Sequence, residues 1–197
     1  MIDPRVSTKD ERFLQLALNL ARRNVGLTGR NPSVGCVITS GDIILGRGNT
    51  QLDGRPHAEV VAIKQASDHY LYKQNKRIKD INVYVTLEPC AHDTTSPSCA
   101  KEIVNFGASR VVYLTADPDK RTNGKGKLLM EKAGIECIEA KILKILYILN
   151  IILVCIVPPL EGSGCNKTTI GESSPVSYTH LRAHETEADL VCRLLLE

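Results

Sequence analysis

The alternation of helix-like and strand-like patterns between residues 8 and 140 is the feature that most limits what this chain can fold into. A capping-box pattern at Thr8–Glu11 opens the first helix-like segment, and apolar residues recur at helical spacing behind it. The helix-like segments are 8–21, 57–65, 98–105 and 127–133. The strand-like segments are 34–39, 43–45, 83–87, 111–115 and 135–138. Strands that alternate with helices through short connections pair in parallel, and the turn at 40–42 predicts one antiparallel hairpin. The sequence therefore predicts an α/β fold, a three-layer α/β/α sandwich with a mixed sheet of about five strands.

Composition narrows the kind of core and the kind of ligand. Hydrophobic residues make up 43% of the chain but aromatic residues only 4%, and Trp is absent, so the core should be aliphatic. The net charge is +3, and no basic stripe with interleaved aromatic residues is visible. Such a stripe is typical of nucleic-acid binding, so we predict no nucleic-acid partner and favour a small anionic substrate.

The seven cysteines favour metal or redox chemistry over disulfides. Their number is odd, their spacing is irregular, and the polar opening residues Met1–Arg5 are not followed by an apolar signal segment. These features predict a cytoplasmic protein in a reducing environment. Cysteines that fall close together are therefore metal-ligand candidates first.

The pattern changes after residue 140. Residues 145–157 carry polar side-chain atoms only at Tyr147 and Asn150, but a membrane span needs about twenty apolar residues. We interpret this segment as a buried hydrophobic one and predict no membrane association. Residues 176–187 resemble a translated sequencing adapter, and His180 and His184 are treated as a coincidence. We thus predict one folded domain at 1–140, which carries the chemistry described below, a hydrophobic segment at a truncated junction at 141–160, and a disordered, non-native tail at 161–197.

Two short strings carry the chemistry of that domain. Pro56–Glu59 reads Pro-His-Ala-Glu, and Pro89–Cys99 begins with Pro-Cys and ends with a second cysteine. His57, Cys90 and Cys99 are three zinc-type ligands that leave a fourth tetrahedral position open, as in a catalytic zinc site. With two thiolates and a neutral imidazole the centre is formally neutral, so a bound water can be acidified and stay nucleophilic.

The placement of these residues suggests how they act. His57 and Cys90 each follow a proline close to a predicted helix start, where the helix dipole would lower a thiol pKa and keep both thiolates available. Glu59 lies two residues after His57 and is the candidate catalytic residue. It would take a proton from the water, pass it to a ring nitrogen and protonate the departing amine.

His-x-Glu followed by Pro-Cys matches the known signature of zinc nucleobase deaminases. The assignment rests on this match and not on the chemistry of the residues alone. Each half alone is common. The alternative interpretation makes the cysteines small buried hydrophobic residues and His57 a hydrogen-bonded core histidine.

Residues 8–140 resemble the deaminase domain of the bifunctional riboflavin-biosynthesis deaminase/reductase. The matching strings are NPSVGCV at 31–37, GRPHAEV at 54–60, YVTLEPCAH at 84–92, DP at 117–118 and AGI at 133–135. Eight residues separate Cys90 from Cys99 and include His92, as in that family, whereas cytidine and transfer-RNA adenosine deaminases typically have two. The resemblance implies a cytidine-deaminase-like fold and a bound Zn2+.

The resemblance also implies a substrate and two residues that bind it. The family removes the 2-amino group of 2,5-diamino-6-ribosylamino-4(3H)-pyrimidinone 5′-phosphate, with His92 on the pyrimidinone and Asn31 on the ribosyl side. The alternatives are an exposed loop histidine and a turn former. This chain departs from the family at Thr94 and Thr95, which replace a Gly followed by a cation in the inter-cysteine loop, and at Thr50, which replaces a histidine. The lost cation leaves phosphate binding open, with Arg55, Lys120 and Arg121 as candidates.

Other functions stay open from the sequence alone. Only 57 residues follow residue 140, and they lack a glycine-rich dinucleotide turn, so we expect no reductase activity. That describes either a single-activity deaminase or a truncated copy of the longer enzyme. The runner-up functions are a related deaminase acting on a free base, nucleoside or tRNA, and a catalytically inactive zinc-binding module. A homo-oligomer is a further possibility.

Overall fold

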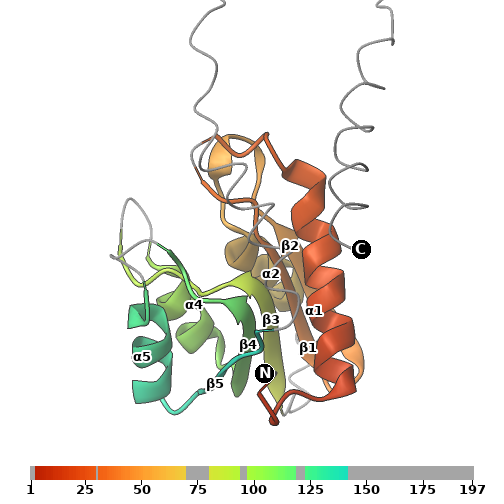
Figure 1. Ribbon diagram of the computed structural model, residues 1–197, viewed down its shortest axis with the longest axis vertical. Helices are drawn as coiled ribbons and strands as arrows, with labels where there is room; N and C mark the ends of the chain where they lie inside the picture. Colours follow the sequence, from red (N-terminus) through yellow and green to blue (C-terminus); the bar gives the residue numbers. More distant parts are fainter. Residues whose placement is uncertain (1–2, 30, 70–79, 94–96, 119–122, 142–197) are drawn as a thin grey trace, which may run out of the picture. The chain divides into compact units, whose positions relative to one another are not determined.

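A mixed sheet with the strand order β2-β1-β3-β4-β5 organises the computed structural model (Figure 1). The structure describes residues 3–29, 31–69, 80–93, 97–118 and 123–141. The strands are β1 (Gly35–Ser40), β2 (Ile43–Asn49), β3 (Ile81–Leu87), β4 (Arg110–Thr115) and β5 (Glu136–Glu139). The helices are α1 (Thr8–Ala21), α2 (Ala58–Asp68), α4 (Cys99–Phe106) and α5 (Lys125–Lys132), with short 3-10 turns at Arg22–Asn24 and Leu52–Gly54.

The strand directions agree with the predicted mixed sheet. β1 is antiparallel to both β2 and β3, whereas β3, β4 and β5 run parallel to one another. The carboxyl ends of parallel strands meet at one edge of a sheet, where α/β proteins commonly place their binding sites. The segments that follow β3 and β4 therefore emerge side by side, and the first of them begins with Glu88, Pro89 and Cys90.

Helices cover both faces of the sheet, which confirms the predicted three-layer sandwich (Figure 1). Glycines in the strands allow the helix backbones to lie very close to the sheet. A Cβ atom on Gly35 of β1 would lie 1.8 Å from the Ala17 carbonyl oxygen of α1, and one on Gly48 of β2 would lie 2.2 Å from the Ala58 carbonyl oxygen of α2. Gly48 pairs with Cys36, the residue after Gly35. Because neighbouring residues of a strand point to opposite faces of the sheet, α1 and α2 pack on opposite faces.

β2 extends to Asn49, beyond the predicted end at residue 45. Gly46 and Gly48 look like strand breaks in the sequence because glycine weakens a strand interior. In the structure both are places where the α2 backbone comes too close for any side chain, since a Cβ on Gly46 would lie 2.1 Å from the Ala62 carbonyl oxygen. The start of α2 is thereby held against the sheet.

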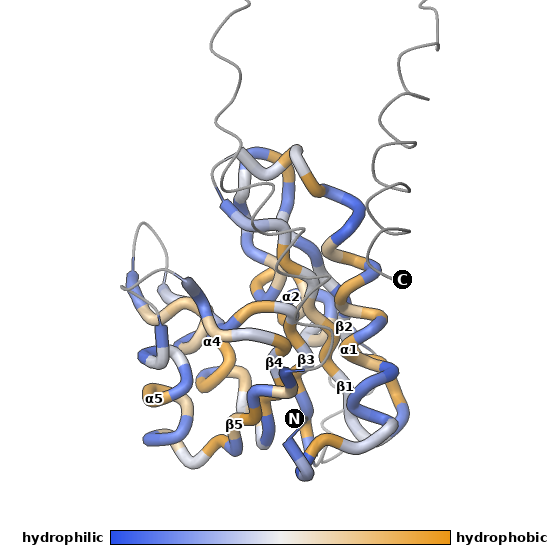
Figure 2. The backbone as a smooth tube through the Cα atoms, in the orientation of Figure 1, coloured by the Kyte–Doolittle hydropathy of each residue, from blue (hydrophilic) through white to orange (hydrophobic). Residues whose placement is uncertain are grey.

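The core is aliphatic, as the composition predicts. Val83, Val85, Val111, Val112 and Ile138 are among its fully buried side chains. Along α1 the backbone tube alternates between hydrophobic and hydrophilic residues (Figure 2), and the residues at 14, 17, 18, 20 and 21 face the sheet. Fully burying an aliphatic side chain of this size is worth about 1.5–3 kcal/mol, so this packing is the main source of stability.

The capping box of α1 lies one residue earlier than predicted. Ser7 is the N-cap, its hydroxyl accepts from the Asp10 N–H, and the Asp10 carboxylate accepts from the Ser7 N–H at 2.8 Å. Thr8 and Glu11 are not used. The shift follows from a tertiary contact, because Arg110 of β4 and Tyr84 of β3 both donate to the buried Asp10 carboxylate at 2.7 and 2.9 Å.

Several predictions fall outside the described residues: the segment 145–157, the tail 161–197 and the loop positions Thr94 and Thr95. Within the ranges that the structure covers, none of the helices has the length and apolar character needed to cross a bilayer.

Candidate functional site

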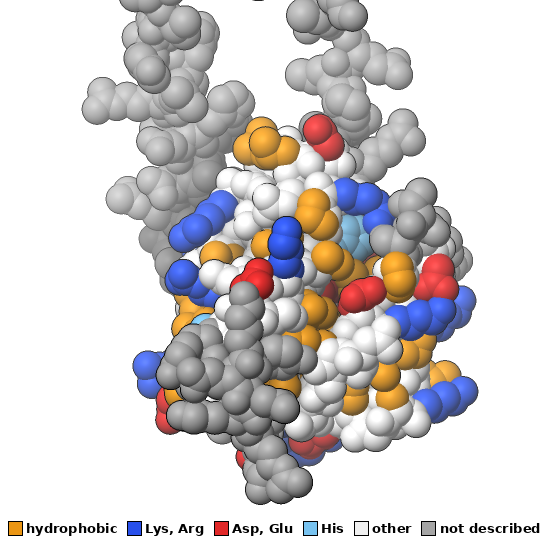
Figure 3. All heavy atoms as spheres, turned by 180° about the vertical axis from the view of Figure 1, so that it is seen from behind, with side chains coloured by type: hydrophobic (Ala, Val, Ile, Leu, Met, Phe, Trp, Pro, Cys, Tyr) orange, Lys and Arg blue, Asp and Glu red, His pale blue; other side chains and the backbone are white. Residues whose placement is uncertain are grey.

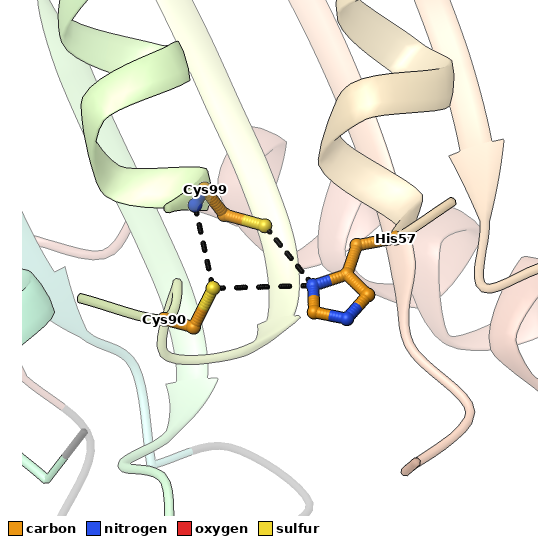
Figure 4. Close-up of side chains that lie close together, drawn as sticks. All are labelled: His57, Cys90 and Cys99. Carbon is orange, nitrogen blue, oxygen red and sulfur yellow. Dashed lines mark hydrogen bonds between the residues drawn. The ribbon is translucent and has the colours of Figure 1, made fainter. Parts of the chain in front are cut away.

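Three side chains from separate parts of the chain converge at the edge of the sheet (Figure 4). The Nδ1 atom of His57 lies 3.3 Å from the Sγ atom of Cys99 and 3.9 Å from the Sγ atom of Cys90. The Cys99 backbone N–H donates to the Cys90 sulfur at 3.3 Å. One ligand atom from each residue lies within 4.8 Å of the others, so the three predicted ligands form one group that could hold a metal ion.

Local structure explains how each of the three is placed. His57 is the N-cap of α2 but makes no capping hydrogen bond with its side chain, which leaves the ring to face the cysteines. Cys99 is the first residue of α4, with Ser98 as the N-cap. Cys90 follows the end of β3 and is not part of a helix, but the start of α4 lies beside it, in agreement with the prediction that Cys90 is near a helix start. The helix start belongs to Cys99, whose N–H points at the Cys90 sulfur.

The spacing of the three ligand atoms fits zinc. Zinc binds thiolate sulfur at about 2.3 Å and imidazole nitrogen at about 2.0–2.1 Å, which in a tetrahedral site puts neighbouring ligand atoms about 3.5–3.8 Å apart. The two N–S separations of 3.3 and 3.9 Å bracket that spacing. Two soft sulfurs with one imidazole are also a zinc-type donor set.

The charges of the group differ between the two cysteines. Hydrogen bonding from Cys99 and from His57 lowers the pKa of Cys90 to about 4, so this residue is a thiolate at neutral pH. The same contact with Cys90, together with burial, raises the pKa of Cys99 well above its ordinary value. The hydrogen bond with Cys90 also raises the pKa of His57. In the metal-free group Cys99 therefore keeps its proton, and metal binding must displace that proton.

Glu59 lies in the first turn of α2 and is only 4% exposed. Burial raises its pKa to about 7, with the His57 charge opposing the rise and the Cys90 charge adding to it. A carboxyl group that titrates near neutral pH can accept and return a proton under cellular conditions.

A cavity of about 170 Å³ joins the metal-ligand group to the other predicted residues. Asn31 and His92 both line it, together with His57, Glu59 and Cys90. The structure thus brings the two predicted substrate-binding residues into the same pocket as the candidate catalytic carboxylate. Its other lining residues are Pro32, Val34, Thr50, Arg55, Leu87, Glu88 and Asp117.

Sequence reasoning assigned no role to Glu88, which is 2% exposed. Its carboxylate accepts from the Gly124 and Lys127 N–H groups at 2.9 and 3.0 Å, which caps the start of α5 from a different part of the chain. A Cβ atom on Gly126 would lie 1.9 Å from the Pro89 carbonyl oxygen, so α5 presses against the residue before Cys90. An acidic residue directly after five buried strand residues was the signal that could have revealed it.

Thr50 and Gly54 hold Asn31 and its neighbours in place. The Thr50 hydroxyl accepts from the Val34 N–H at 2.9 Å and donates to the Pro32 carbonyl oxygen at 3.2 Å. The Asn31 side-chain amide donates to the Gly54 carbonyl oxygen at 3.2 Å. Gly54 has a φ of +86° and a Cβ there would meet the Asn31 amide nitrogen at 2.2 Å, so only glycine fits under Asn31.

Comparison with known proteins settles the family. The pattern of the cytidine and deoxycytidylate deaminase zinc-binding region matches residues 7–115, more than half of the chain. The chain belongs to this family. The match spans the whole ligand group and all of the pocket-lining residues except Asp117.

Similar relatives include riboflavin-biosynthesis proteins, in agreement with the predicted branch of the family. The chain is 40% identical over 127 residues to riboflavin biosynthesis protein RibD of Aquifex aeolicus, covering 64% of this chain and 33% of that protein. It is 34% identical over 131 residues to the diaminohydroxyphosphoribosylamino-pyrimidine deaminase of Buchnera aphidicola subsp. Acyrthosiphon pisum, covering 66% of this chain and 83% of that protein.

A solved structure agrees with the fold. The crystal structure of a diaminohydroxyphosphoribosylaminopyrimidine deaminase/5-amino-6-(5-phosphoribosylamino)uracil reductase from Thermotoga maritima superimposes with a TM-score of 0.63 at 31% identity. The superimposed residues make up 73% of this chain and 39% of the Thermotoga maritima chain. This chain therefore spans about a third of the length of the long RibD relatives it matches, and the predicted cytidine-deaminase-like fold is confirmed.

Proposed function

We propose that this chain catalyses the hydrolytic, zinc-dependent deamination of 2,5-diamino-6-ribosylamino-4(3H)-pyrimidinone 5′-phosphate in riboflavin biosynthesis. The observation that carries the proposal is one pocket in which His57, Cys90 and Cys99 converge beside the buried Glu59. The names of the riboflavin-biosynthesis relatives support this substrate over other pyrimidines. The proposal concerns the deamination alone and places it in the cytoplasm, without nucleic-acid or membrane partners; a homo-oligomer stays a prediction.

His57, Cys90 and Cys99 would hold the zinc ion, and Glu59 would move the protons. When bound, zinc supplies a water acidic enough to attack the carbon that carries the 2-amino group. The Glu59 carboxylate would accept one proton of the water and give it to the adjacent ring nitrogen. It would then accept the second proton, from the hydroxyl group newly attached to the carbon, and give it to the amino group. Water is consumed, ammonia leaves, and the ring gains a carbonyl. One carboxylate can serve each step because it ends each transfer ready for the next.

Asn31 and His92 are proposed to orient the substrate, with His92 on the pyrimidinone and Asn31 on the ribosyl side. Both line the pocket. The cavity is smaller than the roughly 300–1,000 Å³ of typical small-molecule pockets, which suits a single ring inside and the ribosyl phosphate toward its opening.

Ammonia release by the purified full chain tests this function, with zinc content measured on the same sample. We expect turnover of the phosphorylated diaminopyrimidinone and little or none of cytidine. Turnover of cytidine, a free base or a tRNA instead would favour the related-deaminase alternative. Bound zinc in a folded chain that releases ammonia from none of them would favour the inactive zinc-binding module.

A further inference from the structure

The proposed substrate carries a phosphate, and its charge has to be met somewhere near the pocket. Of the described residues that line the pocket, three are acids: Glu59, Glu88 and Asp117. Arg55 is the single arginine or lysine among them. A phosphate close to the acids would be repelled, so the arginine is the favourable place for it.

Exposure distinguishes the catalytic acid from the cation in this pocket. Glu59 is only 4% exposed and lies where the ring must react, whereas Arg55 is an exposed residue. Lys and Arg side chains are spread over the face of the molecule seen from behind (Figure 3). A neutral ring with an anionic tail matches a pocket that is lined both by a buried acid and by an exposed cation.

The backbone around Arg55 is held on both sides. The Gln51 N–H donates to the Pro56 carbonyl oxygen at 3.1 Å, and Asn31 donates to the Gly54 carbonyl oxygen at 3.2 Å. Arg55 also lies two residues before the metal ligand His57. The start of its side chain is therefore at a fixed position relative to the metal-ligand group.

Resting on the proposed function, we propose that Arg55 binds the 5′-phosphate of the substrate at the open side of the pocket. The guanidinium group can donate two parallel hydrogen bonds to phosphate oxygens. Arg55 takes the place of the inter-cysteine loop cation that this chain lacks at Thr94 and Thr95. The other two sequence candidates, Lys120 and Arg121, lie outside the described residues.

The test compares Arg55→Gln with Arg47→Gln, an exposed arginine on β2 outside this pocket. Each variant is assayed with the phosphorylated diaminopyrimidinone and with its dephosphorylated form. We expect Arg55→Gln to raise KM for the phosphorylated substrate by about 10- to 100-fold, the size of one hydrogen bond to a charged group. KM for the dephosphorylated form, kcat and zinc content should change little, and Arg47→Gln should match the wild type.

Two results would overturn the assignment: an unchanged KM in Arg55→Gln, or an equal rise of KM for both forms of the substrate. If the wild type deaminates neither form, the proposed function fails, but the phosphate site is still tested. Calorimetric binding of dCMP and of deoxycytidine then decides. A wild-type preference for dCMP that Arg55→Gln abolishes supports the phosphate site, whereas no preference, or no binding of either, rules it out.

Discussion

Burial of the Glu59 side chain lowers the stability of the folded chain at high pH and gives the carboxyl group a pKa suited to proton transfer. Because its pKa in the folded metal-free chain is about 7 instead of 4.5, the folded state binds more protons than the unfolded state in that range. Folding is therefore less stable above pH 7 than below pH 4.5 on account of this group. Buried acids of this kind persist at sites that need them, since stability and activity are opposed there.

Glu59→Gln should separate the two effects. Glutamine keeps the shape but cannot carry protons, so we expect turnover to fall by roughly 10²–10⁴-fold. Zinc content should stay at one per chain, and the thermal midpoint of the metal-free protein at pH 7 should be unchanged or higher, because a buried charge is removed. Glu131→Gln, at an exposed position on α5, is the control. Near-native turnover in Glu59→Gln would mean that another group moves the protons.

Cys99→Ala should lose the zinc and most of the stability of the domain. Its sulfur is one of the three converging ligand atoms, and two ligands hold zinc far more weakly than three. Cys137→Ala is a matched control, because Cys137 is also buried but lies on β5, outside the ligand group. Elemental analysis should find zinc in Cys137→Ala only. Full zinc in Cys99→Ala would contradict the ligand assignment.

The elements themselves were predictable from periodicity, but their ends were not where tertiary contacts set them. α4 ends at Gly107, in the left-handed conformation that its predicted C-cap role requires. β2 runs past its predicted end because α2 packs on Gly46 and Gly48. The capping box moved from Thr8 to Ser7 because Arg110, a hundred residues away, binds Asp10.

The site shows the same division. The three metal ligands and Glu59 were predictable because they belong to two short sequence motifs, Pro56–Glu59 and Pro89–Cys99. Glu88 and Asp117 reach the pocket because β3 and β4 are parallel and end at the same edge. The parallel pairing was predicted, but no local pattern around either residue indicates that its side chain lines the pocket.

Glu88→Gln should weaken the hydrogen-bonded contact between the segment that follows β3 and the start of α5. The carboxylate accepts from the Gly124 and Lys127 N–H groups, and a glutamine keeps only one acceptor oxygen for them. We expect a loss of about 2 kcal/mol in the free energy of unfolding, the size of one hydrogen bond to a charged group. Glu131→Gln, whose exposed pair with Lys127 is worth about 0.3–0.5 kcal/mol, is the control. If denaturant unfolding gave the same loss of unfolding free energy for the two variants, the Glu88 hydrogen bonds would not stabilise this contact.

At the scale of the whole chain, the predicted division at residue 160 can be tested by deletion. The described residues up to 141 contain both ligand strings, the pocket and the aliphatic core. Residues 161–197 are rich in Gly, Ser and Thr up to Pro175, a composition that favours disorder. We expect removal of 161–197 to leave zinc content and the thermal midpoint nearly unchanged, and limited proteolysis to cut first between residues 161 and 182. A marked fall in either quantity would show that the tail belongs to the domain.

The contact between α1 and the sheet should give the molecule a distinctive response to acid. Burial alone would raise the pKa of Asp10, but hydrogen bonds from Arg110, Ser7 and Tyr84 lower it from 3.8 to about 2. A group whose pKa is depressed in the folded state stabilises that state above its unfolded value, and the stabilisation disappears as the pH falls from about 4 to about 2. Asp10→Asn removes the charge and leaves Arg110 with Glu136 as its remaining acidic partner.

At pH 7 we expect Asp10→Asn to lose about 2–3 kcal/mol of unfolding free energy, since a largely buried charge loses its partner. This difference from the wild type should shrink between pH 4 and pH 2. Acid also releases zinc, but the metal-ligand group is the same in both proteins, so the difference between them reports Asp10. Asp42→Asn is the control, because Asp42 pairs with Lys9 at an 89% exposed position and its loss should change stability little. A difference that stays constant from pH 7 to pH 2 would mean that the Asp10 carboxylate is not held in its charged form by Arg110 and Tyr84.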